Sequence, residues 1–281
     1  MQHDPPRPRG PATSGASTFA AADGNAYELQ MGRWSRRLAP LFVEFAGIGN
    51  ARRVLDVGCG TGNLALFMAQ RDPTLARVHG IDVCPAYVEY ARRRSDDARL
   101  QFHIGDACAL PFSDGTFDHA LAMLALQFMP RAELAVHEMR RVTRPGGIVA
   151  AATWDTRGGY VAMRLVLDAA AMLGEAGRVH RAAAYTRPMS RPGDLARVWA
   201  DVGLKSVRQD SVTIRMEFGS FADFWAPVTG TEGPLAGYVA GLGLEDRARL
   251  REAVRLAYLD GETEGPRSFA ATAWVVRGAV P

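Results

Sequence analysis

Short apolar runs alternate with amphipathic segments along the first half of the chain. The apolar runs have the length of buried strands, and the segments between them repeat at three and four residues, which is the period of a helix. The predicted strands cover residues 54–57, 78–82, 100–104, 117–124 and 148–154. The predicted helices cover residues 62–70, 85–94 and 131–142. This alternation predicts an α/β fold with a doubly wound, mostly parallel sheet and helices on both faces.

The pattern becomes looser after residue 154. Helical periodicity returns in two stretches separated by a polar loop, and strand-like alternation returns in two more. The predicted helices cover residues 160–173 and 193–202, and the predicted strands cover residues 206–217 and 269–276. Between these strands, aromatic residues, glycines and a charged helix predict a helical insertion over the carboxyl edge of the sheet. We expect cap or substrate segments at about residues 155–203 and 218–266.

The N-terminal part has two sections. Residues 1–24 contain prolines separated by small and polar residues, with too little apolar surface to offset the entropy of ordering, so we expect a disordered leader. In residues 35–46, apolar side chains recur at three- and four-residue spacing, which predicts an amphipathic helix. Residues 25–50 are therefore expected to precede the sheet as a lid and a helix, and residues 51–281 to form the main domain.

Composition indicates an ordinary globular protein. Hydrophobic residues make up 48% of the 281 residues, and no apolar run reaches the roughly 18 residues of a membrane span. The absence of a secretory signal pattern and the odd count of 3 cysteines favour the cytoplasm. The net charge of +3 is dispersed, with Lys205 the only lysine, so we expect no nucleic-acid partner. No metal-site spacing of His and Cys is present, and nothing specifies an oligomeric state.

A glycine-rich turn follows the first predicted strand, at Asp56-Val-Gly-Cys-Gly-Thr-Gly62. Such a turn places a ligand at the carboxyl ends of the strands. A dinucleotide site has the spacing G-x-G-x-x-G, whereas Gly58, Gly60 and Gly62 are two residues apart. Asp56 would repel a pyrophosphate, but its charge suits an ammonium group and a sulfonium, while the helix N-terminus suits a carboxylate. S-adenosylmethionine offers all three groups.

Two further carboxylates follow the next two predicted strands. Asp82 ends the second strand, about where an acidic residue accepts hydrogen bonds from ribose hydroxyls, a role that fits NAD equally well. Asp106 ends the third strand and could accept a hydrogen bond from an adenine amino group. Val83 and Ala107 come directly after them and would line the same adenosine site. Each aspartate could instead cap a helix or order a turn.

Five motifs in order resemble the class I S-adenosylmethionine-dependent methyltransferases, most closely the branch of ubiquinone and menaquinone C-methyltransferases and related small-molecule enzymes. The motifs are Val54-Leu-Asp-Val-Gly-Cys-Gly-Thr-Gly62, Gly80-Ile-Asp82, Gly105-Asp-Ala-Cys-Ala-Leu-Pro-Phe112, Phe117-Asp118 and Arg140-Arg-Val-Thr-Arg-Pro-Gly-Gly147. The resemblance covers residues 52–154. It implies S-adenosylmethionine as the cofactor and a Rossmann-like, seven-stranded sheet whose last strand is antiparallel.

Residues 27–35 resemble the stretch that precedes the sheet and closes over the donor in related bacterial methyltransferases. This resemblance implies a lid in which Tyr27 and Arg33 contact the donor and Trp34 faces the donor or the substrate. Leu124, at the end of the fourth predicted strand, stands where the donor pocket of this family takes backbone and apolar contacts. A simple packing role stays open for each of these side chains.

The acceptor pocket is expected from the less regular segments. The aromatic candidates are Trp154, Phe224, Trp225 and Tyr238. They suit an apolar or aromatic small molecule, or else they pack the inserted helices together. Gln127 is a candidate polar group on the substrate side and His180 a weak candidate for a general base. Catalytic residues are otherwise unassigned.

These features predict a methyltransferase that uses S-adenosylmethionine to methylate a small, apolar or aromatic acceptor. In-line displacement requires donor and acceptor to be aligned in a dry pocket and needs no covalent intermediate. Three alternatives stay open. They are a non-catalytic S-adenosylmethionine-binding or scaffold protein of the same fold, an RNA or protein methyltransferase, which the dispersed arginines disfavour, and an NAD-dependent oxidoreductase, which the loop spacing disfavours.

Overall fold

The computed structural model describes residues 23–49 and 51–281. The leader predicted over residues 1–24 lies, except for its last two residues, outside the described part of the chain. None of the helices within the described ranges is long and apolar enough to cross a bilayer.

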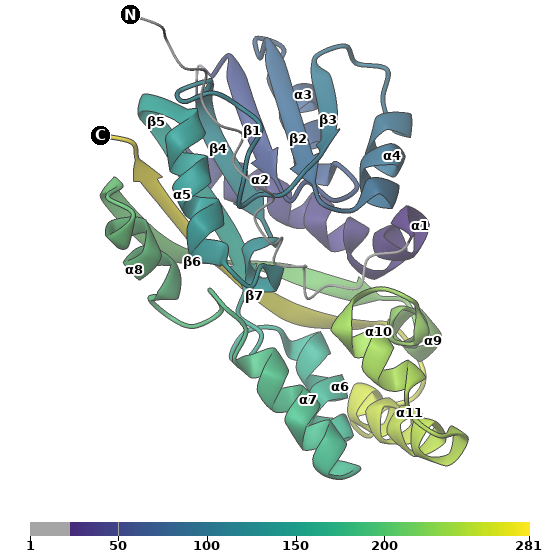
Figure 1. Ribbon diagram of the computed structural model, residues 1–281. Helices are drawn as coiled ribbons and strands as arrows, with labels where there is room; N and C mark the ends of the chain where they lie inside the picture. Colours follow the sequence, from purple (N-terminus) through teal and green to yellow (C-terminus); the bar gives the residue numbers. More distant parts are fainter. Residues whose placement is uncertain (1–22, 50) are drawn as a thin grey trace, which may run out of the picture.

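A single sheet of 7 strands runs through the molecule in the order β3-β2-β1-β4-β5-β7-β6 (Figure 1). The strands are β1 (Arg53–Val57), β2 (Arg77–Asp82), β3 (Leu100–Ile104), β4 (Phe117–Met123), β5 (Thr143–Trp154), β6 (Lys205–Phe218) and β7 (Arg267–Ala279). Strands β1 to β5 pair in parallel, while β7 lies between β5 and β6 and is antiparallel to both. The predicted Rossmann-like sheet with a reversed last strand is confirmed.

Helices cover both faces of the sheet. One face carries α2 (Arg33–Ala46), α3 (Asn63–Arg71) and α4 (Pro85–Arg93), and the other carries α5 (Ala132–Val142) and α8 (Asp194–Asp201). Strand side chains alternate between these two cores, so Val54 faces the first and Leu55 the second, both fully buried. The alternation explains why the strands read as continuous apolar runs in the sequence.

Further helices lie beyond the carboxyl ends of the strands (Figure 1). They are α6 (Val161–Met172), α7 (Glu175–Tyr185), α9 (Phe221–Trp225), the 3-10 turn η3 (Ala226–Thr229), α10 (Gly233–Ala240) and α11 (Leu244–Leu259). The predicted helical insertion is therefore present. The polar loop predicted before residue 193 is wrong in part, because α7 occupies much of it. Gly177 lets α7 pack against α6, since a Cβ there would lie 1.8 Å from the Ala170 carbonyl oxygen.

The N-terminal helix is longer than its apolar pattern predicts. It begins as α1 (Gly24–Tyr27), where the Asp23 side chain accepts a hydrogen bond from the Asn25 N–H at 3.0 Å. A π-helical turn, η1 (Glu28–Gly32), then leads into α2. The polar residues of η1 interrupt the amphipathic period, so the sequence pattern does not show this turn. Hydrogen bonds from Thr61 and Asn63 to Glu28 stabilise it.

Candidate functional site

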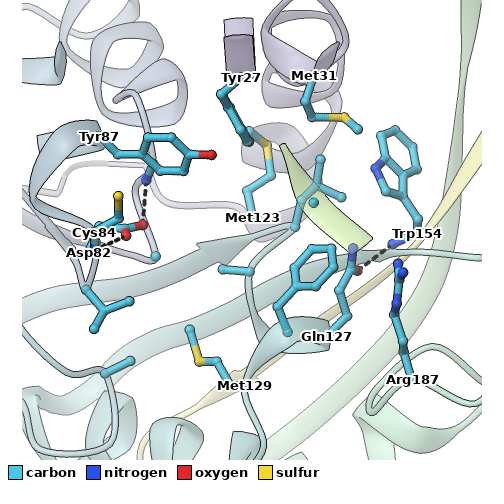
Figure 2. Close-up of a pocket in the computed structure, with 18 of the residues that line it drawn as sticks. Tyr27, Met31, Asp82, Cys84, Tyr87, Met123, Gln127, Met129, Trp154 and Arg187 are labelled. Atoms are coloured by element: carbon cyan, nitrogen blue, oxygen red, sulfur yellow. Dashed lines mark hydrogen bonds between the residues drawn. The ribbon is translucent and has the colours of Figure 1, made fainter. Parts of the chain in front are cut away.

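A cavity of about 170 Å³ opens where the parallel strands end, between the sheet edge, the N-terminal helix and α10 (Figure 2). The turns after β1, β2, β3, β4 and β5 all contribute to its wall, as an open α/β sheet requires of a ligand site. The residues predicted from the sequence that line it are Tyr27, Gly58, Gly60, Asp82, Val83, Asp106, Ala107, Leu124, Gln127 and Trp154.

The glycine loop after β1 has a backbone that only glycine adopts readily. Gly58, Gly60 and Gly62 have φ angles of 69°, 52° and 84°. A Cβ on Gly58 would also lie 2.3 Å from the Cβ of Ala125, on the turn after β4. The loop is thus held against the neighbouring strand end with its backbone facing the cavity, while Gly62 stands at the start of α3 and does not line the cavity.

Asp82 is fixed at the end of β2 by two backbone donors. Its Oδ2 accepts from the Gly60 N–H at 2.9 Å and its Oδ1 accepts from the Cys84 N–H at 2.9 Å. Burial raises the pKa of this carboxyl, and the two backbone hydrogen bonds oppose that rise. Asp82 also helps to order the turn into α4, but both of its oxygens keep a lone pair for a ligand.

The ends of β3 and β4 supply the next part of the wall. The Asp106 Oδ1 accepts from the Cys108 N–H at 2.8 Å, which orients the carboxylate at the cavity edge. Leu124 has a φ of 62°, a left-handed conformation that is uncommon for a residue other than glycine. Its N–H donates to the Ala152 carbonyl at 2.8 Å, so pairing with β5 holds the strained residue in place.

Asp56 lies behind the main cavity rather than on its wall. It lines a small adjoining cavity that shares Tyr27, Gly58 and Met123 with the main one. The side chain is 1% exposed, and its Oδ2 has no hydrogen-bond partner. Burial, followed by the charge of Asp82, raises the pKa of Asp56 to about 8. A buried carboxylate oxygen without a partner is unfavourable until a cation or a donor is supplied.

The N-terminal helix forms part of the cavity roof. Tyr27 lines both cavities, and its ring centroid lies 5.0 Å from that of Tyr87 on α4 (Figure 2). Burial raises the pKa of the Tyr27 phenol, so the hydroxyl stays protonated at neutral pH. Tyr27 lies beside Gly60 of the glycine loop, while its predicted role as a lid that contacts the donor stays a prediction.

Glu28 ties this helix to the glycine loop, a role that the sequence analysis missed. Its Oε1 accepts from the Thr61 hydroxyl at 2.5 Å and from the Asn63 Nδ2 at 2.8 Å, and its carboxylate also pairs with Arg36 and Arg94. Burial would raise the pKa of Glu28, but these partners outweigh it and lower the pKa. Only the position of Glu28 within the predicted lid pointed to this role.

Glu232 joins three segments around the cavity and was also missed. It is 1% exposed, its carboxylate accepts from the Tyr87 hydroxyl, and its Oε1 accepts from the Asp23 N–H at 2.8 Å. The Glu232 carbonyl accepts from Gln30 Nε2 at 3.0 Å. Glu232 thereby connects α4, the N-terminal helix and α10, which begins at the next residue.

Several predicted site residues lie outside the cavity. The Arg33 guanidinium forms an ion pair with Asp223 at 3.0 Å and stacks on Trp34, its guanidinium carbon 4.3 Å from the ring centroid, and Arg33 does not line the cavity. Trp34 packs edge-on against Phe218 in the core. The remaining members of this group are Phe224, Trp225, Tyr238 and His180. The first two belong to a buried aromatic cluster on α9, and the other two stack on each other with centroids 4.5 Å apart.

The far end of the cavity has a different composition. Trp154 ends β5, and its backbone N–H donates to the Gln127 Oε1 at 3.0 Å. Tyr160, Met163 and Arg187 complete this end, and Arg187 was not among the predicted residues. Nothing in the sequence separates Arg187 from the many other arginines, because only the fold brings its loop to the cavity.

Comparison with known proteins identifies the domain. Residues 54–147 match the family model described as a methyltransferase domain. The demethylmenaquinone methyltransferase of Thermus thermophilus is 39% identical over 117 residues, which cover 41% of this chain and 51% of that protein. The chain spans about half the length of the curated relatives it matches.

Solved structures share the fold over more of the chain. Haemonchus contortus phosphoethanolamine N-methyltransferase 2, in complex with phosphomonomethylethanolamine and S-adenosylhomocysteine, aligns over 92% of this chain and 57% of its own, with a TM-score of 0.57 and 15% identity. The [4+2]-cyclase SpnF aligns over 95% of this chain and 88% of its own, with a TM-score of 0.54 and 24% identity. These likenesses show the fold, and the family match shows a methyltransferase domain over residues 54–147.

Proposed function

We propose that this chain, which contains a class I S-adenosylmethionine-dependent methyltransferase domain, transfers a methyl group to a small, apolar or aromatic acceptor by in-line displacement. The observation that carries the proposal is the grouping of three aspartates at one end of the cavity. Asp82 and Asp106 lie on its wall, and Asp56 presents a buried, unpartnered oxygen directly behind it. Carboxylates in this arrangement suit a cationic nucleoside ligand.

Each aspartate would hold a different part of the donor. Asp82, oriented by the backbone of Gly60 and Cys84, would accept from the ribose hydroxyls. Asp106 would accept from the adenine amino group, with Val83 and Ala107 packing against the base. Asp56 would receive the ammonium group, which supplies the partner that its Oδ2 lacks. Tyr27 and Leu124 would close the pocket over the sulfonium.

The same charges disfavour a dinucleotide. A pyrophosphate at the loop would lie beside Asp82, whose charge it would repel, and would make ionisation of the buried Asp56 still more costly. Glu28 adds a third carboxylate close to the start of α3, where a nucleotide phosphate would otherwise bind. The loop therefore favours a ligand with positive charge.

When bound, S-adenosylmethionine supplies an electrophilic methyl group whose transfer leaves the electron pair on sulfur. The chain itself positions the two reactants and excludes water. Met31, Met123 and Met163 give the cavity an apolar wall, which suits an apolar or aromatic acceptor. The inserted helices and the N-terminal helix act as cap and lid in this proposal, because Glu232 links them across the cavity.

No base is required of the lining residues if the acceptor atom is nucleophilic at neutral pH. His180 stacks on Tyr238 outside the cavity, and burial lowers its pKa. Gln127 does line the cavity, but an amide does not remove a proton, so its proposed role is to orient the acceptor.

Cys59, Cys84 and Cys108 are free thiols, which supports a reducing compartment such as the cytoplasm.

The test is methyl transfer itself. The full chain would be incubated with S-adenosylmethionine carrying a labelled methyl group and a panel of small phenols, amines, thiols, carboxylic acids and quinone precursors. We expect S-adenosylhomocysteine release with at least one member, and less with bulk RNA or protein. Release only with RNA or protein would contradict the small-molecule acceptor, and donor binding without release from any acceptor would contradict methyl transfer.

The likeness to a [4+2]-cyclase supports a second candidate, a protein that binds the donor without transferring its methyl group. In that case the donor would bind at the aspartates, and no labelled methyl group would leave it under any condition of the same assay. An intact set of Asp56, Asp82 and Asp106 serves both candidates, so turnover and not binding separates them.

A further inference from the structure

The end of the cavity opposite the aspartates holds a half-buried cation. Arg187 follows α7, and its side chain lines the cavity wall (Figure 2). Its guanidinium carbon lies 5.1 Å from the ring centroid of Phe128. Within the described residues, the guanidinium forms no ion pair with a carboxylate and no hydrogen bond, although the Tyr160 phenol is close enough to interact with its charge. Burial lowers the pKa of Arg187, but an arginine remains charged at neutral pH.

Two further donors lie at the same end. The indole Nε1 of Trp154 is buried without a hydrogen-bond partner, and the residue is only 3% exposed. Gln127 is also 3% exposed, and its Oε1 is committed to the Trp154 backbone N–H at 3.0 Å. That bond leaves the Gln127 amide NH2 as a donor. Figure 2 shows Arg187 beside Gln127 and Trp154 on the side of the cavity away from Asp82.

This grouping consists of donors only. A guanidinium, an indole N–H and an amide NH2 come from the loop after α7, the end of β5 and the turn η2 (Leu126–Phe128). A buried donor without an acceptor, such as the Trp154 Nε1, is costly, and an anion that accepts from all three groups would remove that cost. Arginine in particular suits a planar oxyanion, because its N–H groups match two oxygens at once.

We propose that the acceptor of this enzyme carries a carboxylate, which Arg187, Gln127 and Trp154 bind at the end of the cavity opposite the donor. The inference rests on the proposed function, since it assigns the acceptor of the same cavity. A single arginine balances one negative charge, and the neighbouring walls are the Met163 side chain and the aromatic ring of Tyr160. The chemical class is therefore a small carboxylic acid with an apolar or aromatic body.

The test compares carboxylates with matched neutral amides. The full chain, saturated with S-adenosylhomocysteine, would be titrated with benzoate, phenylacetate and cinnamate and with the corresponding primary amides, using ligand-observed NMR. Because a charge-assisted hydrogen bond in a protected site is worth roughly a factor of ten or more in affinity, we expect at least one acid to bind about tenfold more tightly than its amide.

Variants assign that preference to Arg187. Arg187→Met keeps an unbranched apolar stem and should abolish the preference for acids, while Arg187→Lys keeps the charge without the planar fork and should retain part of it. The matched control is Arg178→Met, an exposed arginine on α7 paired with Glu175. Acids that bind no more tightly than their amides, or a preference unchanged in Arg187→Met, would overturn the inference.

Failure of this inference differs from failure of the proposed function. Binding of S-adenosylhomocysteine is measured first, in the wild type and in Arg187→Met, where we expect it to agree within about twofold, since Arg187 lies away from the aspartates. If the nucleoside does not bind, the proposed function fails, and the same acids are then titrated into the unloaded chain. If it binds and the acids show no preference, only the carboxylate assignment fails.

Discussion

The two ends of the cavity are built in different ways. The donor end consists of turns that follow the consecutive strands β1 to β4, with carboxylates fixed by backbone N–H groups of the same turns. The far end combines the last residue of β5 with α6 and the loop after α7. One end is defined by sheet topology, whereas the other depends on how inserted segments pack. The two ends also carry opposite charge.

The largest effect that would break this comparison is expected from Asp82→Ala. The substitution removes the proposed ribose acceptor and also the partner of the Gly60 and Cys84 N–H groups. Loss of the two proposed hydrogen bonds from the ribose hydroxyls to this buried carboxylate should weaken S-adenosylhomocysteine binding by about 100-fold, measured by calorimetry. Asp201→Ala, at an exposed ion pair with Arg197, is the control. Affinity within twofold of the wild type would rule out the ribose role.

A smaller, pH-dependent effect is expected from Asp56. Its pKa is about 8 in the folded protein, above its ordinary value of 3.8, so the folded state holds the proton more tightly than the unfolded chain does. The contribution of Asp56 to the free energy of unfolding is therefore largest below about pH 4 and falls as the pH rises toward 8. Donor affinity should change in the opposite sense, because only the ionised carboxylate attracts the ammonium group.

Asp56→Asn separates these two effects. At pH 8.5 the ligand-free variant should melt at least about 3 °C above the wild type, because a buried charge has been removed. Its affinity for S-adenosylhomocysteine should be about tenfold lower there and nearly independent of pH between 6 and 9. A wild-type affinity that does not rise with pH would contradict the proposed ammonium site.

A smaller loss of donor affinity than for Asp56 is expected from Glu28, which connects the N-terminal helix to the glycine loop. Glu28→Gln keeps one acceptor for Thr61 and Asn63 but loses the charge that pairs with Arg36 and Arg94. We expect a loss of donor affinity of about three- to tenfold, with the dissociation rate carrying the change, measured by stopped-flow fluorescence. Glu252→Gln on α11, at an exposed pair with Arg255, is the control. An unchanged dissociation rate would show that this contact is only structural.

The smallest effect is expected from Arg33, which the resemblance placed at the donor. Because its guanidinium pairs with Asp223 and is about a third exposed, Arg33→Ala should lower the free energy of unfolding by about 0.5–1 kcal/mol, measured by urea denaturation. Donor affinity should stay within about twofold of the wild type. A tenfold loss of donor affinity would show that Arg33 contributes to the donor site, as the resemblance implied.

The donor end could be predicted from the sequence because parallel strands end at a common edge. Once the alternation of strands and helices was recognised, Gly58, Asp82 and Asp106 were expected at one site, and the structure brings them together. The apolar runs also predicted buried strands in this region, although the face that each side chain takes came only from the structure. The alternation pattern predicted strands near β6 and β7, and the family resemblance implied that the last strand is antiparallel. The place of β7 between β5 and β6 was not predicted.

The far end could not be predicted in the same way. Arg187 lies far from the donor motifs in sequence, and only the packing of α7 brings it to the cavity. Glu232 was missed for the same reason, because the packing of α10 brings it to Tyr87 and Asp23. Phe224, Trp225 and Tyr238 were chosen for aromatic character, but that character serves a buried cluster and a stacked pair with His180. The helix α7 was missed because its polar side chains interrupt the apolar period of a helix. It packs against α6 through Gly177, which has no side chain to contribute to that period.

The central claim, that the aspartate end of the cavity is a site for a cationic nucleoside, is tested most directly by one calorimetric titration of the full chain with S-adenosylmethionine and, in parallel, with NAD. We predict one site with micromolar affinity for S-adenosylmethionine and no measurable heat from NAD. Micromolar binding of NAD with no signal from S-adenosylmethionine would contradict the account.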